Sequence, residues 1–137
     1  MARARANQVA ALPWRKRGER IEILLITSRE TQRWVIPKGW PMANLAAFNA
    51  AKREAFEEAG VDGRVRRTAI GRYTYSKRAA DGSRQACLVT VYALNVLQQH
   101  RAWPERGQRR RFWFTAAEAA GKVQEATLRA IIRAFAR

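Results

Sequence analysis

Apolar residues along this chain fall into short runs separated by turn residues, a pattern typical of strands. Turns are expected at residues 15–18 and 80–83, and residues 38–41 are expected to be irregular because Gly and Pro occur there together. The strands predicted from these runs cover residues 9–14, 20–27, 33–36, 65–76, 84–97 and 110–114.

Two longer stretches have the residue spacing of amphipathic helices. Residues 45–59 are rich in Ala and Glu, Asn44 is the expected N-cap, and Gly60 stands where a helix-ending glycine belongs. Residues 124–136 form the second helix, and its apolar stripe consists of Leu128, Ile131, Ile132 and Phe135.

The order of these elements predicts a mixed α/β (α+β) fold with a central helix and a C-terminal helix. A shorter helix is expected after Thr115, because the spacing from Thr115 to Glu118 is that of a capping box. The sequence has no internal repeat and no linker. A length of 137 residues suits one domain, so we expect residues 1–137 to fold as a single unit.

Composition excludes several classes of protein. One cysteine, Cys87, excludes an intrachain disulfide framework, and a single histidine, His100, excludes a Cys/His zinc cluster. No apolar run approaches the ~18–20 residues that span a bilayer. The N-terminus also lacks the apolar segment and cleavage site of a signal peptide, so a cytoplasmic protein with no membrane partner is expected.

The charge of the chain is strongly unbalanced. Lys and Arg number 27 and Asp and Glu number 11, which gives a formal net charge of +16. Such an excess favours polyanions such as nucleic acid or a small, highly phosphorylated substrate. Charge alone does not choose between them.

Three of the eleven acids lie within five positions of the predicted central helix. Glu54, Glu57 and Glu58 stand at i, i+3 and i+4, so they project from one helix face. Taken alone, this face has two readings. It is either a solvated face that Lys52 and Arg53 neutralise, or a site where carboxylates converge on a hard cation such as Mg²⁺ or Mn²⁺.

The residues around this face favour the second reading. From Gly39 to Val61 the chain resembles the signature of the Nudix hydrolases: Gly, five residues, Glu, seven residues, Arg-Glu, an aliphatic residue, any residue, Glu-Glu, any residue, Gly and an aliphatic residue. The positions in register are Gly39, Arg53, Glu54, Ala55, Glu57, Glu58, Gly60 and Val61.

One position of the pattern departs from the family. Its first glutamate falls on Leu45. In the family this glutamate mainly supports the loop and the arginine of the box, so the resemblance implies retained hydrolysis with metal binding that is looser or differently supported.

The resemblance implies a Nudix fold, in which a mixed sheet lies between helices, and a hydrolase that cleaves pyrophosphate bonds with Mg²⁺ or Mn²⁺. Carried over by position, Glu54, Glu57 and Glu58 become metal ligands, together with the backbone carbonyl of Lys38. Either Glu57 or Glu54 would orient or deprotonate the attacking water. Arg53 completes the expected catalytic set by holding the carboxylates through hydrogen bonds. The metals would neutralise phosphate charge and activate water.

A later loop often supplies a further metal ligand in this family. Glu105 is the candidate here, with a plain surface glutamate as the alternative reading. Four aromatic residues are candidates for stacking a base, although core or loop packing is the alternative for each: Trp40, Tyr73, Tyr75 and Trp103.

The segments before the box and at residues 109–114 resemble the subgroup that acts on diphosphoinositol polyphosphates and diadenosine polyphosphates. Such substrates carry many phosphates, which guanidinium and ammonium groups bind. The residues expected to contact the substrate are Arg33, Lys38, Gly39, Arg109, Arg110 and Arg111.

RNA is the alternative partner. The chain could remove pyrophosphate from RNA 5′ ends, or it could be a nucleic-acid-binding module on a weakly active Nudix scaffold. Arginines scattered outside the box favour a polyanion, whereas no helix-turn-helix, RNA-binding aromatic signature or zinc finger is present. The expected assembly is a monomer or a homodimer.

Overall fold

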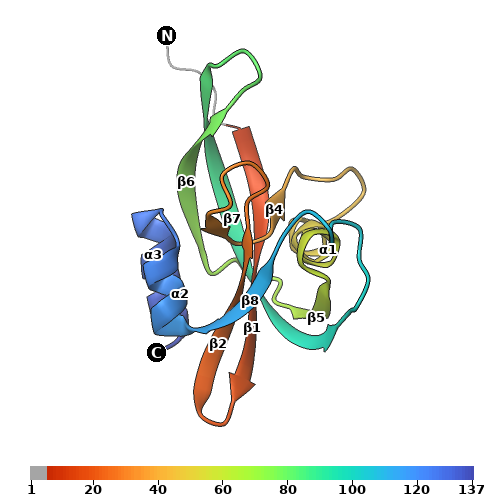
Figure 1. The fold of residues 1–137 in the computed structure, drawn as a ribbon, viewed down its shortest axis with the longest axis vertical. Helices are drawn as coiled ribbons and strands as arrows, with labels where there is room; N and C mark the ends of the chain where they lie inside the picture. The colour runs from red at the N-terminus through yellow and green to blue at the C-terminus, as the bar shows by residue number, and fades with distance from the viewer. Residues whose placement is uncertain (1–5) are drawn as a thin grey trace.

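The sheet of this protein is built around one long strand, β1 (Ala6–Arg17). The computed structural model describes residues 6–137 (Figure 1). Residues 1–5 of the expected domain lie outside the described residues. The other strands are β2 (Arg20–Thr27), β3 (Trp34–Val35), β4 (Lys38–Gly39), β5 (Val61–Val65), β6 (Gly71–Arg78), β7 (Arg84–Gln99) and β8 (Arg111–Thr115).

The sheet is mixed and branched. Its main order is β3-β2-β1-β7-β5, and β4 pairs with β1, β6 with β7 and β8 with β2. Strands β1 and β7 run parallel, and the remaining pairs are antiparallel. This arrangement confirms the predicted mixed α+β fold.

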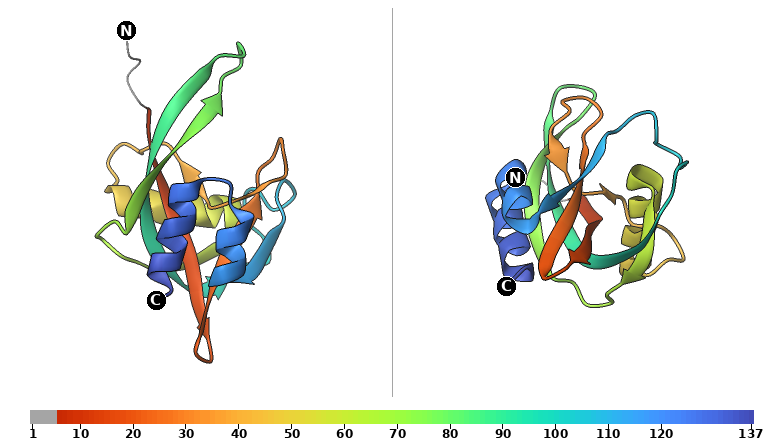
Figure 2. Two further views of the ribbon diagram at one scale, coloured as in Figure 1. Left: turned by 90° about the vertical axis from the view of Figure 1, so that its left-hand side faces the viewer. Right: turned by 60° about the horizontal axis from the view of Figure 1, so that its bottom comes forward.

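Helices cover both faces of the sheet. Helix α1 (Ala47–Ala59) lies on one face, while α2 (Ala116–Lys122) and α3 (Ala126–Phe135) lie together on the other (Figures 1 and 2). The α1 face buries small side chains, Ala51, Ala55 and Ala59, against the sheet. No helix in residues 6–137 is long and apolar enough to cross a membrane.

Local signals in the sequence located several elements correctly. The strand at residues 20–27 is β2, and Thr115 and Glu118 form the predicted capping box at the start of α2. Gly60 ends α1 in the left-handed conformation, with φ of 67°. Cys87 is buried.

Other predicted boundaries were wrong because strand pairing extends or divides the elements. Strand β1 continues to Arg17, since its last residues pair with the start of β2, and the turn therefore begins at Gly18. Residues 65–76 do not form one strand. Strands β5 and β6 both pair with the long β7, with Val65 opposite Leu94 and Gly71 opposite Val91.

The segment before α1 also differs from the prediction. Residues 38 and 39 are not irregular but form β4, which pairs with Val9 and Ala10 of β1. The N-cap of α1 is Ala46 rather than Asn44, because Asn44 has a left-handed φ of 66° and stands in the preceding loop.

Candidate active site

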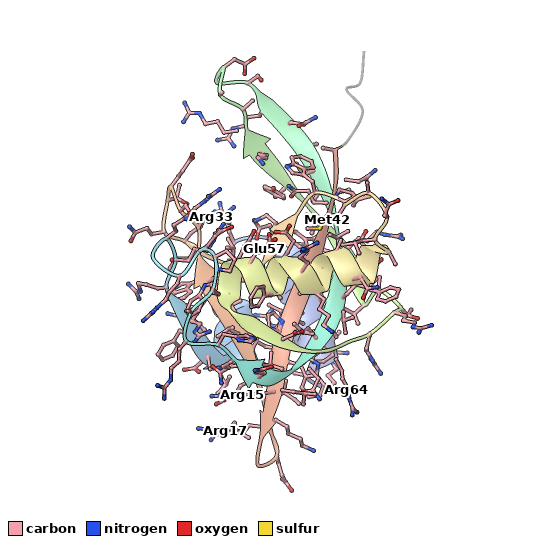
Figure 3. The ribbon with its side chains drawn as sticks, turned by 90° about the vertical axis from the view of Figure 1, so that its right-hand side faces the viewer. Arg15, Arg17, Arg33, Met42, Glu57 and Arg64 are labelled. Carbon is pink, nitrogen blue, oxygen red and sulfur yellow. The ribbon has the colours of Figure 1, made fainter. Side chains whose placement is uncertain are left out.

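The acidic face of α1 lies against the loop that enters the helix. Glu54 and Glu57 are half-buried, and Glu58 is buried, with 8% of its surface exposed. In Figure 3, Glu57 lies on the same side of α1 as Met42 and Arg33. The three carboxylates therefore do not form a fully solvated surface.

Strand β4 approaches this face through its backbone. A Cβ on Gly39 would overlap the carboxylate group of Glu54. The neighbouring Lys38 N–H donates to Glu58 Oε1 at 3.3 Å. Pairing of β4 with β1 fixes its position, so the central strand of the sheet positions the backbone that contacts the carboxylates.

Crowding of the carboxylates favours their protonated forms. Burial, a hydrogen bond to Glu58 and the charges of neighbouring acids raise the pKa of Glu54 to about 8. Burial also raises the pKa of Glu58, against the opposing effect of Arg109. Without a bound cation, Glu54 and Glu58 thus share a proton more readily than isolated glutamates do.

Arg109 links this face to the loop before β8. Its Nη2 lies 3.8 Å from Glu58 Oε2, and its Nε donates to Glu105 Oε1 at 2.8 Å. The Glu105 N–H donates to the carbonyl of Glu57 at 3.0 Å, so the loop is tied directly to α1. The structure therefore brings Glu105 and Arg109 to the acidic face.

A second group of charged side chains lies near Lys38, apart from the loop that carries Arg109. The Lys38 ammonium stands over the ring of Tyr75 at 4.9 Å, and burial lowers its pKa, although Glu58 and Glu125 act in the opposite direction. Arg33 Nη1 pairs with Glu125 Oε2 at 3.1 Å. Sequence reasoning missed Glu125, because no local pattern links it to a residue 92 positions away.

Among the predicted phosphate-contacting arginines, Arg111 has another role and Arg110 lies at the surface. The Arg111 guanidinium donates to the carbonyls of Ala59, Gly60 and His100 at 2.8–3.2 Å and thereby caps the end of α1. Arg110 is exposed and lies over the ring of Trp34 at 5.5 Å. We therefore assign Arg111 to the architecture of the helix end rather than to phosphate contact.

Three of the four candidate stacking residues are engaged in packing. Tyr73 is buried, the Tyr75 hydroxyl donates to Gln8 Oε1 at 2.6 Å, and Trp103 packs against Gly60 and Arg111. Trp40 is 45% exposed and lies beneath the Lys77 ammonium at 4.8 Å. Only Trp40 of the four presents a large exposed surface near the box.

The comparisons with known proteins agree with this geometry. A family model described as the NUDIX domain matches residues 4–135. The chain belongs to the Nudix family.

Individual relatives support the same assignment. The chain is 34% identical over 103 residues to Nudix hydrolase 12, mitochondrial, of Arabidopsis thaliana, covering 73% of this chain and 51% of that protein. It is 30% identical over 120 residues to diphosphoinositol polyphosphate phosphohydrolase 3-beta of Bos taurus, covering 86% and 69%. The chain thus spans about half the length of the plant relative.

A solved structure shows the same fold. The crystal structure of C. elegans Ap4A hydrolase superposes with a TM-score of 0.67 over 96% of both chains, at 20% sequence identity. At this identity the likeness concerns the fold alone. It confirms that the helices and sheet described above are arranged as a Nudix fold.

Within the Nudix box, Arg53 and Leu45 lie on the outer side of α1. Arg53 is exposed, and its Nε lies 3.7 Å from Glu57 Oε1. Leu45, 37% exposed, shares a shallow depression with Arg53 and Phe56. A carboxylate at position 45 would therefore stand near the box arginine, as the family pattern implies.

Nudix proteins generally use divalent metal ions, and the donor set of this chain suits one. The oxygens of Glu54, Glu57 and Glu58 are hard ligands, and the absence of a side chain on Gly39 lets the Glu54 carboxylate lie directly against the backbone of β4. No group of three His, Cys, Asp or Glu side chains in residues 6–137 is arranged as a ready-made metal-binding cluster. Mg²⁺ does not need one, because it keeps several waters and binds through one or two carboxylates plus substrate phosphates.

Proposed function

We propose that this Nudix protein is a metal-dependent hydrolase that cleaves pyrophosphate bonds in a highly phosphorylated substrate. The substrate classes proposed are diphosphoinositol polyphosphates, diadenosine polyphosphates and other nucleoside diphosphate derivatives. One observation carries the proposal: the partly buried carboxylates of α1 lie directly beside two half-buried cationic side chains, Lys38 and Arg109. Such a site can hold a cation and attract phosphate oxygens at once.

The ligands proposed for Mg²⁺ or Mn²⁺ are the carboxylates of Glu54, Glu57 and Glu58, with the Lys38 carbonyl and Glu105 as further donors. When bound, the metal would neutralise phosphate charge and activate water. The proximity of Glu105 to Glu57 and to Arg109 supports its inclusion.

The protein's own residues then have separate parts in the reaction. Either Glu57 or Glu54 accepts a proton from the attacking water, whose oxygen forms a bond to phosphorus. The bridging P–O bond breaks, and the bridging oxygen leaves with the second phosphate group. Arg53 lies close enough to orient Glu57, because the two side chains are paired.

Substrate phosphates would bind to the cations around the carboxylates. Lys38, Gly39 and Arg33 stand on the sheet side of the site, and Arg109 stands on the loop side. Exposed Arg110 is a peripheral contact for an extended substrate. The name of the bovine relative supports a polyphosphate substrate.

RNA is the second candidate, as a substrate with a 5′ pyrophosphate or as a bound polyanion. The observation in its favour is the number of exposed arginines away from the box, including Arg66, Arg67, Arg72 and Arg78. Binding of RNA through many such contacts would weaken steeply with added salt. Hydrolysis of a small polyphosphate held in a confined site would depend on salt much less.

The test is a substrate panel with the purified chain. Diphosphoinositol, diadenosine and nucleoside polyphosphates and RNA with 5′ triphosphate or cap are each offered with Mg²⁺ or Mn²⁺, and phosphate-containing products are measured. The background is set by the Glu57→Gln/Glu58→Gln variant, and Glu19→Gln/Glu30→Gln, two exposed acids, is the charge-matched control. We expect the control to retain hydrolysis; no product above background with any substrate would contradict the proposal.

A further inference from the structure

A cavity of about 370 Å³ lies outside the site formed by the carboxylates. It is formed where the ends of β1, β5 and β7 meet the C-terminal end of α3. None of its lining residues belongs to the Nudix box. In Figure 3, Arg64, one of these residues, is labelled below α1, whereas Glu57 is labelled above it.

The floor of this cavity is aromatic and apolar. Trp14 of β1 and Phe135 of α3 pack edge to face, with ring centroids 5.5 Å apart and planes at 62°. Both rings are partly buried against the core on the α3 side of the sheet, and Ile21 of β2 extends the apolar floor. A ring held in this way offers a rigid surface for another ring to stack on.

The rim of the cavity is positively charged. Arg64 and Arg66 are exposed, and neither takes part in any ion pair within residues 6–137. The described lining contains no acidic side chain, while Asn95 adds an amide that can donate and accept. Unpaired guanidinium groups are suited to binding phosphate in a bidentate manner.

We propose that this cavity binds a nucleotide unit, with its base against Trp14, its phosphate on Arg64 and Arg66, and Asn95 on a polar edge. Aromatic stacking and guanidinium–phosphate pairing are the two contacts by which proteins hold single nucleotides. The volume lies within the range of about 300–1,000 Å³ that is usual for small-molecule sites. The proposal goes beyond the proposed hydrolysis and does not depend on it.

Adenosine 5′-monophosphate is the probe, because it has no pyrophosphate bond for the carboxylate site to cleave. Its binding to the full chain is measured by calorimetry at physiological salt with EDTA present. Adenosine, which lacks the phosphate, and ribose 5-phosphate, which lacks the base, are measured in parallel. The proposal requires the nucleotide to bind more tightly than either half.

Paired variants separate this site from general attraction to a basic protein. Arg64→Gln/Arg66→Gln should weaken binding by about tenfold or more, the loss expected for charge-assisted hydrogen bonds. Arg72→Gln/Arg78→Gln removes the same charge from exposed positions on β6 and should leave binding unchanged. Equal weakening by the two variants, or no effect of the first, would overturn the proposal.

Two further measurements complete the test. The Arg64→Gln/Arg66→Gln variant should keep its melting temperature and its hydrolysis of small polyphosphates, so failure of the proposed function and failure of this site give different results. A short single-stranded RNA carrying a 5′ monophosphate distinguishes the source of the nucleotide. Tighter binding of RNA than of the mononucleotide, lost in the Arg64/Arg66 variant alone, assigns the site to an RNA end, and equal binding assigns it to a free nucleotide.

Discussion

Helices α1 and α3 pack on opposite faces of the same sheet, but they bury different kinds of side chain. Helix α3 places Leu128, Ile131 and Ile132 in the core, whereas α1 contacts the sheet through alanines and also buries Glu58. Small side chains bring α1 close to the sheet, so its carboxylates contact the backbone of β4. The α3 face therefore contributes mainly to stability. The α1 face buries less apolar surface and carries a charged site instead.

The largest expected effect comes from removing a core side chain on the α3 face. Ile132 is fully buried, so Ile132→Ala should lower the free energy of unfolding by about 2–5 kcal/mol. Urea denaturation in EDTA measures the loss. Leu97→Ala, at a position that is 64% exposed, is the control and should change it by less than about 0.5 kcal/mol. Loss of hydrolysis by folded Ile132→Ala protein would show that packing on the α3 face also supports the site on the α1 face.

The next change acts on the α1 face. Gly39→Ala places a methyl group where the Glu54 carboxylate lies, so we expect hydrolysis and metal affinity to fall by about 10–100-fold. Stability should fall less than in Ile132→Ala. Gly121→Ala, which adds a methyl group in open space on α2, is the matched control. Full activity of Gly39→Ala would mean that the contact between β4 and Glu54 does not matter.

A pH series tests the α1 face without any substitution in the core. The folded chain holds a proton on Glu54 up to a pKa of about 8, whereas the unfolded chain releases it near the ordinary glutamate pKa of 4.5. The metal-free protein should therefore lose stability as pH rises from about 4.5 to about 8, because over this range the folded state keeps a proton that the unfolded state releases. The lowered pKa of Lys38 acts in the opposite direction, between that lowered pKa and the ordinary lysine pKa of 10.5.

Melting temperatures in EDTA across this range measure the effect. Glu54→Gln should flatten the dependence, since an amide does not titrate, and added Mg²⁺ should stabilise the wild type more at pH 8 than at pH 5.5. An equal slope in the wild type and in Glu54→Gln would contradict the electrostatic account of the α1 face.

The smallest expected effect concerns the one departure from the family pattern. Leu45→Glu puts a carboxylate beside exposed Arg53 and should tighten metal binding by up to about fivefold, the value of a surface ion pair. Leu45→Gln controls for the change in polarity. Unchanged metal affinity and turnover in Leu45→Glu would show that this position has no supporting role.

How far the sequence predicted the structure depended on the range of each interaction. The spacing of Glu54, Glu57 and Glu58 and the capping residues Gly60 and Thr115 act within a few positions, so they were predictable. The division of residues 61–78 into β5 and β6 depends on pairing with a distant strand, β7, and was not.

The same limit applied to the site. The family resemblance implied that Glu105 lies near the acidic face, but two contacts were not predicted. Arg111 reaches the carbonyls at the end of α1, and Glu125 pairs with Arg33, across separations of 52 and 92 residues. Such contacts depend on how distant segments of the chain fold together, and no local sequence pattern predicts them.

The central claim is that the α1 carboxylates form a cation site, and titration with Mn²⁺ followed by electron paramagnetic resonance tests it most directly. The account predicts that the wild type and the Glu19→Gln/Glu30→Gln control bind Mn²⁺, and that Glu57→Gln/Glu58→Gln does not. Equal Mn²⁺ binding by all three proteins would contradict it.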